Sequence, residues 1–159
     1  LESSFLIYLL RPHHRNFNKT IVKRPKVYFY DTALVCWFLG IQTNTQLATH
    51  PMRGDIFEGM VLTELVKKRT NAGLPVNLFY WRDKTGHEID VLVDEAGKLF
   101  PIEIKSGKTI SNEYFKNLEY WCRLSGAKNW MVLYGGPQNQ KRSRGGQVLN
   151  WRGLSRDLF

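Results

Sequence analysis

The stretch from residue 78 to residue 107 constrains the fold of this 159-residue chain more than any other. Three apolar runs, at residues 79–82, 89–93 and 99–104, alternate with the turn sequences KTG and EAGK. The glycines of these turns supply the positive φ angles that tight turns need. Short apolar runs between such turns predict a meander of three strands, on which the rest of the chain must pack.

The second and third strands of this meander carry charges where an ordinary core sheet has apolar residues. Because side chains alternate between the faces of a strand, we expect Asp90 to point away from its apolar neighbours. The expected faces of the second strand are Ile89, Val91 and Val93 on one side, and Glu88, Asp90, Leu92 and Asp94 on the other. On the third strand, Glu103 and Lys105 share the face opposite Ile102 and Ile104. Aligning the charged faces of this hairpin places Asp90 near Glu103 and Lys105.

Two carboxylates and an amine on one side of a hairpin suit a particular chemistry. Mg²⁺ binds hard oxygen ligands, keeps several waters and needs few protein carboxylates. A lysine beside the ion could orient or deprotonate a water that attacks a phosphodiester, and could stabilise the charge that develops. The alternative is a cross-strand salt bridge of Lys105 with Asp90 or Glu103 on a solvated face. The pattern is short, and it leaves both interpretations open.

Residues 53–69 form the clearest helical pattern in the chain. Apolar residues recur at helical spacing, and the last turn carries three cationic residues that complement the helix dipole. Glu58 and Glu64 lie within this mostly apolar cylinder. A buried carboxylate is costly unless it is paired or binds a metal. Helical geometry does not choose between the two glutamates, and both could pair with a nearby Lys or Arg.

The remaining segments predict further helices and strands in alternation. We expect helices at residues 33–39 and 112–124, short strands at 20–22, 26–30, 129–134 and 147–151, a terminal helical turn at 153–159, and polar loops at 42–51 and 138–146. The helix at 33–39 is apolar nearly all round, so it should be buried or dock on a neighbouring domain. From residue 53 onward the order is helix, three strands, helix, strand.

Composition favours a soluble, basic domain with an anionic partner. The formal net charge is +9 and 43% of residues are hydrophobic, so nucleic acid is a candidate partner. Cations that could contact backbone phosphates are Lys108, Lys116, Lys141, Arg142 and Arg144, with a solvated surface as the alternative for each. No apolar run is long enough to span a bilayer.

The two cysteines point to a reducing compartment. Cys36 and Cys122 stand in apolar helical contexts without a CxxC or histidine spacing. We therefore expect buried free thiols and a cytoplasmic location.

Two motifs resemble those of a nuclease superfamily. Asp90, a turn, and then Glu103-Ile104-Lys105 resembles the PD-(D/E)XK signature, with Ile89 where that signature has proline. The stretch from Arg53 to Glu58 resembles the first-helix glutamate motif of Holliday-junction-resolvase-like members. The resemblance implies an α/β fold with the restriction-endonuclease-like αβββαβ core, in which helices flank a central mixed sheet. It also implies that Glu58, Asp90 and Glu103 hold Mg²⁺ or Mn²⁺ and that Lys105 positions the attacking water.

Longer motifs extend this resemblance to nearly the whole chain. The segments YLLRPHHRN, RGDIFEGMVLTEL, FYWRDKTGHEIDVLV and PIEIKSGKT look like the C-terminal domain, of unknown function, of a prokaryotic AAA+-type ATPase family. A P-loop ATPase domain and a winged-helix segment precede this domain in that family. Residues 1–50 would then be the tail of that upstream region, and residues 51–159 the nuclease-like domain. ATP would bind only upstream, because Ile102 stands where a P-loop ending in SGKT needs glycine.

The resemblance leaves three functions to compare. The first is a divalent-metal-dependent DNA endonuclease. The second is a catalytically silent module that binds nucleic acid or protein and regulates the attached ATPase. The third is a structural dimerisation module, which predicts paired charges and a closed site. Fold alone does not decide among them.

Overall fold

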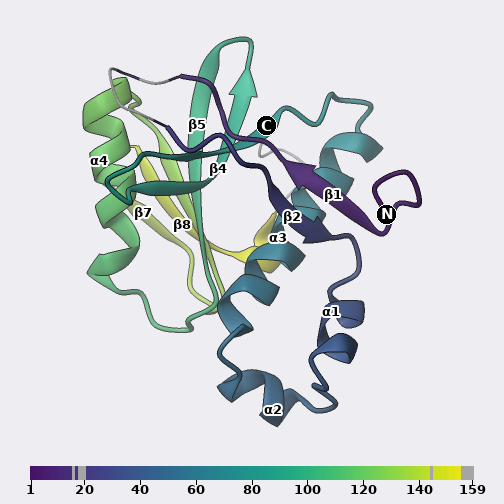
Figure 1. Cartoon of the computed structure of the whole chain (residues 1–159). Coiled ribbons are helices and arrows are strands. Elements are labelled where there is room, and N and C mark those ends of the chain that lie inside the picture. Colours follow the sequence, from purple (N-terminus) through teal and green to yellow (C-terminus); the bar gives the residue numbers. More distant parts are fainter. Residues whose placement is uncertain (16, 18–20, 144, 155–159) are drawn as a thin grey trace.

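The central element of the fold is a six-stranded mixed sheet (Figure 1). This computed structural model describes residues 1–15, 17, 21–143 and 145–154. The strands lie in the order β3 (Leu78–Arg82), β4 (Glu88–Glu95), β5 (Lys98–Lys105), β6 (Trp130–Tyr134), β8 (Gly146–Asn150) and β7 (Gln140–Arg142). The β5–β6 and β6–β8 pairs are parallel, and the other pairs are antiparallel. The predicted meander is therefore confirmed as β3–β4–β5.

Helices cover both faces of this sheet. The long helix α3 (Arg53–Asn71) packs its buried leucines and valines against Val91, Val93 and Ile102. On the other face, α4 (Lys116–Ser125) packs Leu118 and Trp121 against a second apolar cluster. The predicted α/β class, with a mixed sheet flanked by helices, is confirmed. So is the order of helix, three strands, helix and strand.

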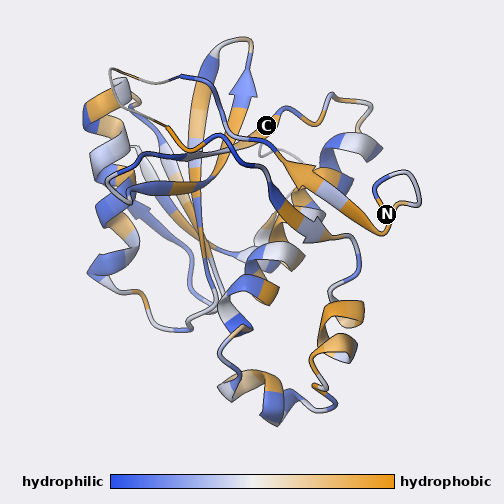
Figure 2. Cartoon of the chain, in the orientation of Figure 1, coloured by the Kyte–Doolittle hydropathy of each residue, from blue (hydrophilic) through white to orange (hydrophobic). Residues whose placement is uncertain are grey.

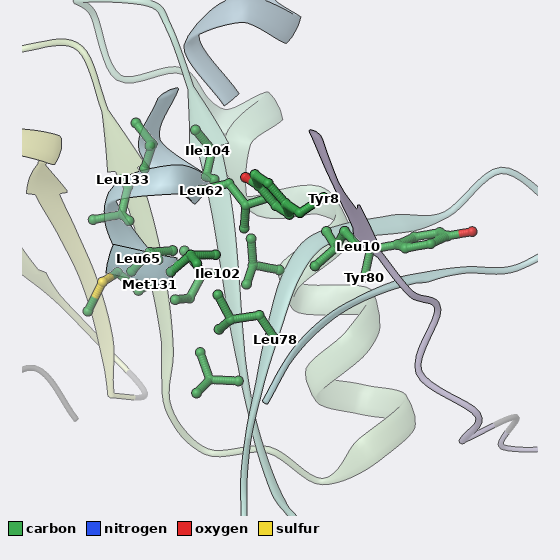
Figure 3. Packing of buried hydrophobic residues seen from close by; sticks show 14 residues of the cluster. Tyr8, Leu10, Leu62, Leu65, Leu78, Tyr80, Ile102, Ile104, Met131 and Leu133 are labelled. Atoms are coloured by element: carbon green, nitrogen blue, oxygen red, sulfur yellow. The ribbon is translucent and has the colours of Figure 1, made fainter. Parts of the chain in front are cut away.

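A separate two-stranded sheet packs on α3 and on the edge of the main sheet. It consists of β1 (Ile7–Leu10) and β2 (Lys26–Phe29), paired antiparallel. Tyr8 and Leu10 of β1 belong to the same buried cluster as α3, and the Tyr8 hydroxyl lies 3.2 Å from Oγ1 of Thr63. Figure 3 shows this cluster with Tyr8, Leu10, Leu62, Leu65, Leu78, Tyr80, Ile102, Ile104, Met131 and Leu133 labelled. Residues on both sides of the boundary predicted near residue 50 therefore share one core.

The short helix α1 (Thr32–Phe38) begins as the sequence predicts but is not buried. The Asp31 carboxylate caps it by accepting a 2.8 Å hydrogen bond from the backbone N–H of Ala33. Trp37 is 72% exposed and Phe38 is 63% exposed, so the prediction of burial is wrong. Figure 2 shows this helix as an apolar segment at the periphery. Docking on a neighbouring domain stays a prediction.

Several predicted boundaries change in the structure. The predicted loop at 42–51 contains α2 (Asn44–Thr49), because Thr43 and Gln46 form a reciprocal capping box. The predicted loop at 138–146 contains β7, which extends the sheet by pairing with β8. The helix predicted at 112–124 opens with a 3-10 turn (Asn112–Phe115), and a second 3-10 turn (Trp151–Gly153) follows β8. Thr20 and residues 155–159 lie outside the described residues.

A β-bulge in β4 changes which side chains share a face. Trp81 pairs with Ile89 and Phe79 pairs with Leu92, so Asp90 and Val91 together lie opposite a single residue of β3. Consequently Ile89 joins the apolar cluster of α4, whereas Val91 joins that of α3. The predicted alternation that grouped Ile89 with Val91 is therefore wrong.

Two further predictions concern compartment and membrane. Cys36 and Cys122 are free thiols, as predicted, but both are only half-buried. Within the described part of the chain, no helix has the length and apolarity to cross a membrane.

Candidate functional site

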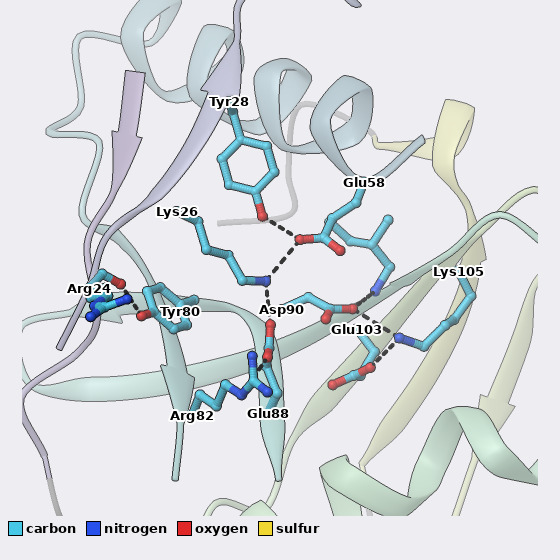
Figure 4. A network of polar contacts seen from close by, with 11 residues as sticks. Arg24, Lys26, Tyr28, Glu58, Tyr80, Arg82, Glu88, Asp90, Glu103 and Lys105 are labelled. Carbon is cyan, nitrogen blue, oxygen red and sulfur yellow. Dashed lines mark hydrogen bonds and ion pairs between the residues drawn. The ribbon is translucent and has the colours of Figure 1, made fainter. Parts of the chain in front are cut away.

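Asp90, Glu103 and Lys105 come together at the β4–β5 hairpin, as the sequence predicts. The Lys105 ammonium lies 2.6 Å from Oε2 of Glu103 and 3.0 Å from Oδ2 of Asp90. The same Asp90 oxygen accepts a 2.8 Å hydrogen bond from the backbone N–H of Ile104. Lys105 thus bridges two carboxylates, and Asp90 is oriented by both the side chain and the backbone of β5 (Figure 4).

Burial distinguishes this group from a salt bridge on a solvated face. Asp90 is 7% exposed and Glu103 is 1% exposed. Oε1 of Glu103 is buried and finds no hydrogen-bond partner among the described residues. Such an oxygen lacks the compensation that buried polar groups normally have. The solvated-face alternative therefore does not fit Asp90 and Glu103.

Glu58 reaches the same region from α3 but pairs with a different lysine. Its Oε1 accepts hydrogen bonds from the Tyr28 hydroxyl and, at 3.2 Å, from the Lys26 ammonium. The structure brings Glu58 close enough to Asp90 for their charges to interact, while its direct partners come from β2. Glu64, by contrast, forms the expected pairing, 2.9 Å from the ammonium of Lys67.

The sequence reasoning missed the residues that β2 and the neighbouring strands contribute. Lys26 bridges Glu58 and Glu88, and Arg82 also pairs with Glu88 at 3.5 Å. The alternation of β2 puts Lys26 and Tyr28 on one face, which is a signal present in the sequence. The sequence holds no signal that this face meets Glu58, because that contact depends on how the small sheet packs on α3.

Burial and mutual repulsion disfavour the ionised forms of Glu58 and Glu103. Burial, and then the charge of Asp90, raise the pKa of the Glu103 carboxyl well above its usual range, against the opposing effect of Lys105. Burial and Asp90 also raise the pKa of Glu58, although Lys26 and Tyr28 oppose them. An added cation would relieve this repulsion.

Lys105 and Tyr28 both keep their protons. Burial alone would lower the pKa of Lys105, but Asp90 and Glu103 outweigh burial and raise it. Burial and the charge of Glu58 raise the pKa of Tyr28 above its usual value, so its hydroxyl remains a hydrogen-bond donor. At neutral pH both groups therefore face the carboxylates in their protonated forms.

The carboxylates are not arranged as a preformed metal centre. Among the described residues, no three His, Cys, Asp or Glu side chains are grouped so that they could hold a metal ion as they stand. Ammonium groups occupy positions between the acids, with Lys26 between Glu58 and Glu88 and Lys105 between Asp90 and Glu103. The donor chemistry still suits a hard divalent cation, because the acids offer only oxygen and Oε1 of Glu103 is unpartnered.

No described contact joins the predicted phosphate-contacting cations to Glu58, Asp90 or Glu103. Lys116 pairs with Glu113 at 2.6 Å, and the Arg142 guanidinium lies 5.3 Å from the centre of the Phe115 ring. Lys141 is exposed on β7, and Lys108 follows β5. Arg144 lies outside the described residues. Their contacts with nucleic acid stay a prediction.

Comparison with known protein families divides the chain in two. The family described as Domain of unknown function (DUF4143) matches residues 53–154, and Domain of unknown function (DUF8612) matches residues 1–45. Similar curated proteins include one uncharacterized protein from Mycobacterium bovis (strain ATCC BAA-935 / AF2122/97) and one from Mycobacterium tuberculosis (strain ATCC 25618 / H37Rv). Each is 32% identical over 111 residues, which cover 70% of this chain and 24% of the relative. The chain thus spans about a quarter of those relatives, and no solved structure matches it.

Proposed function

Because the chain belongs to the family described as Domain of unknown function (DUF4143), whose name carries no activity, we propose a function from the site itself. The domain is a nuclease-like module that cleaves DNA phosphodiesters with a divalent cation, Mg²⁺ or Mn²⁺. As part of the same proposal, it is attached to an AAA+-type ATPase, as the resemblance of its longer motifs implies. The relatives, about four times as long as the matched region, are long enough to include such a domain.

One observation carries the proposal: a single lysine bridges two carboxylates that are almost completely buried. A salt bridge retained only for stability gains little from such burial, because removing two charges from water costs about as much as their attraction returns. The unpartnered Oε1 of Glu103 adds to that cost. Perturbed groups of this kind cluster at functional sites. The arrangement of Asp90, Glu103 and Lys105 is therefore better explained by chemistry than by stability.

Each residue has a distinct part in this proposal. Glu58, Asp90 and Glu103 are the oxygen donors that would hold the cation. When bound, the cation would supply Lewis-acid polarisation of the phosphodiester and a lower pKa for a coordinated water. Lys105, held protonated between Asp90 and Glu103, orients the attacking water and stabilises negative charge that develops on the phosphate. The hydrogen bond from the Ile104 N–H keeps Asp90 in a fixed orientation.

The substrate follows from charge rather than from base recognition. A formal net charge of +9 attracts the phosphate backbone of DNA irrespective of its sequence. Cations such as Lys108, Lys141 and Arg142 would contact phosphates, which position a duplex without reading its bases. We therefore expect weak sequence preference and a strong dependence of binding on salt.

A catalytically silent regulatory module is the second candidate, and one observation favours it. Glu58, Glu88, Asp90 and Glu103 each already have a lysine partner. Paired charges are also what a purely structural dimerisation module predicts. A silent module would bind nucleic acid or a partner protein without cleaving it, whereas the cleavage proposal requires the acids to accept a cation.

Cleavage of DNA by matched variants tests the proposal. Supercoiled plasmid and radiolabelled single- and double-stranded oligonucleotides are incubated with Mg²⁺, Mn²⁺ or EDTA. The wild type should cleave only with the cation, and Asp90→Asn and Lys105→Ala should each lose this activity while remaining folded. Glu64→Gln, which changes a carboxylate paired with Lys67 elsewhere on α3, should cleave like the wild type. Binding by all four proteins without cleavage by any would support the silent module instead.

A further inference from the structure

Two donors from β2 converge on one oxygen atom of Glu58. The Tyr28 hydroxyl and the Lys26 ammonium both bond to Oε1, and no described contact involves Oε2 of that carboxylate. Figure 4 shows both donors reaching Glu58 from the same side. Oε1 is thus held by β2, which leaves the other oxygen available to a further partner.

The position of Tyr28 is itself fixed by its neighbours. Its ring stacks on that of Tyr8, with centroids 5.7 Å apart and planes inclined at 22°. The two tyrosines lie directly opposite each other, Tyr8 on β1 and Tyr28 on β2. Next to Glu58, Gly59 faces the same ring, and a Cβ atom there would lie at van der Waals distance, 3.4 Å, from Cδ1 of Tyr28. The donor hydroxyl therefore belongs to a packed ring rather than to a mobile side chain.

The donors and the acceptor belong to segments with different family matches. Lys26 and Tyr28 lie within residues 1–45, and Glu58, Asp90, Glu103 and Lys105 lie within residues 53–154. The acids of the second segment therefore meet a tyrosine and a lysine supplied by the first.

We infer that Tyr28 is a positioning residue for Glu58, so that the cation site is shared by the β1–β2 sheet and the nuclease-like domain. This inference rests on the proposed function, because it takes Glu58 to be a cation ligand. The terminal torsion of a glutamate is broad, so a free carboxylate samples many orientations. Anchoring Oε1 removes this freedom before the cation arrives. Hydrogen-bond partners of metal ligands commonly affect affinity about 10- to 100-fold.

Tyr28 gives a cleaner test than Lys26. The Lys26 ammonium orients Glu58 but also repels an incoming cation, so its removal has two opposing effects on affinity. Tyr28 is neutral, and Tyr28→Phe removes one hydroxyl while keeping the ring that packs on Tyr8. Tyr30→Phe is the matched control, because the Tyr30 ring also packs on Tyr8, with centroids 4.7 Å apart, two residues along the chain.

The experiment is titration calorimetry with Mn²⁺ at pH 8 on the whole chain, with thermal unfolding of each variant in parallel. Tyr28→Phe should weaken Mn²⁺ binding about tenfold, and Tyr30→Phe should bind like the wild type. If Tyr28→Phe binds Mn²⁺ as tightly as the wild type, the inference is overturned. If the wild type itself binds no Mn²⁺, the proposed function fails first, and the two failures are thereby distinguished.

A double-mutant cycle separates positioning from general loosening of the fold. In a Glu58→Gln background, Tyr28→Phe should have no further effect on Mn²⁺ affinity, because it acts through the carboxylate that is now absent. A full tenfold loss persisting in that background would show that the hydroxyl does not act through Glu58, and would contradict the inference even if every variant is folded.

Discussion

Oδ2 of Asp90 lies 3.0 Å from the ammonium of Lys105 and also accepts the backbone N–H of Ile104 at 2.8 Å. A side chain and a backbone group of β5 thus fix one carboxylate of β4. The bulge in β4 brings this aspartate into reach of Glu58 on α3 as well as Glu103 on β5. Asp90 is consequently the acid whose charge couples the two halves of the site.

This coupling predicts the effect of neutralising Asp90. Its charge helps to raise the pKa of Glu103, so Asp90→Asn should lower the pKa of the Glu103 carboxyl. The variant also leaves Lys105 paired with Glu103 alone, which acts in the same direction. Carbon-detected NMR titration of the glutamate carboxyls measures the change. Asp94→Asn is the control on the same strand, since Asp94 pairs with His13 instead, and an equal decrease there would contradict the coupling.

Glu103 should make the protein less stable as the solution becomes more alkaline. Its pKa in the folded state is raised above the ordinary value of 4.5, so its protonation favours the fold. That stabilisation is complete below the unfolded pKa and is lost as the pH rises through the folded pKa. Glu103→Gln removes the buried charge, so at pH 8 it should have a higher free energy of unfolding than the wild type.

Urea denaturation of Glu103→Gln and the wild type between pH 4 and pH 9 measures this effect. The difference between the two proteins should widen with increasing pH, because only the wild type gains a buried charge. A constant difference across this range would show that Glu103 has an ordinary pKa in the folded protein.

Removal of Lys105 should have the opposite effect on stability. Lys105→Met leaves Asp90 and Glu103 as neighbouring buried carboxylates without a shared counter-ion, which should cost about 2–4 kcal/mol at pH 8. The loss should shrink as the pH falls, because protonation of Glu103, whose pKa is raised by burial and by Asp90, removes one of the charges. Lys67→Met is the matched control, because the pair of Lys67 with Glu64 is exposed, and it should change stability by less than about 0.5 kcal/mol. Similar losses of stability in both variants would contradict the prediction that removing the lysine from buried carboxylates costs more than removing it from an exposed pair.

Asp83 provides a test that stability and cation binding are separable. This buried carboxylate accepts hydrogen bonds from the backbone N–H and hydroxyl of Thr85, the N–H of His87 and the hydroxyl of Tyr120. Burial alone would raise its pKa, but these hydrogen bonds together outweigh burial and lower it. Its contribution to stability is therefore present above the unfolded pKa and is lost as the pH falls through the folded pKa.

Asp83→Ala should accordingly lower the free energy of unfolding by about 2–3 kcal/mol at pH 7, because several donors lose their acceptor. Mn²⁺ affinity of the folded variant should stay within about twofold of the wild type, a small change on the free-energy scale. Denaturation and calorimetry on the same preparation check both statements. A loss of cation affinity as large as that of a site variant would show that Asp83 belongs to the site.

Local patterns predicted the parts of the fold that local physics determines. Glycine-containing turns and apolar runs located the meander, and the pairing of Asp90 with Lys105 followed from hairpin geometry. The face of the sheet on which Ile89 lies could not be predicted, because a bulge has no clear sequence signature. Such a bulge reverses the face of every residue on one side of it. The α2 helix was missed although its capping pair, Thr43 and Gln46, was present, since its polar composition resembles that of a loop.

The missed part of the site depends on tertiary packing. Lys26 and Tyr28 share a face of a short strand, but their partner Glu58 lies on a helix about thirty residues later in the chain. No periodicity links those positions. The sequence could therefore predict which acids carry the proposed chemistry, while only the structure shows that β2 supplies the side chains that hold one of them.

The most direct test of the account is titration calorimetry with Mn²⁺ on the wild type and on Glu103→Ala. The wild type should bind Mn²⁺ with measurable heat, and Glu103→Ala, which removes the buried carboxylate with the unpartnered oxygen, should lose most of that binding while remaining folded. No heat from the wild type, or equal affinity in the two proteins, would contradict the claim that these carboxylates form a cation site.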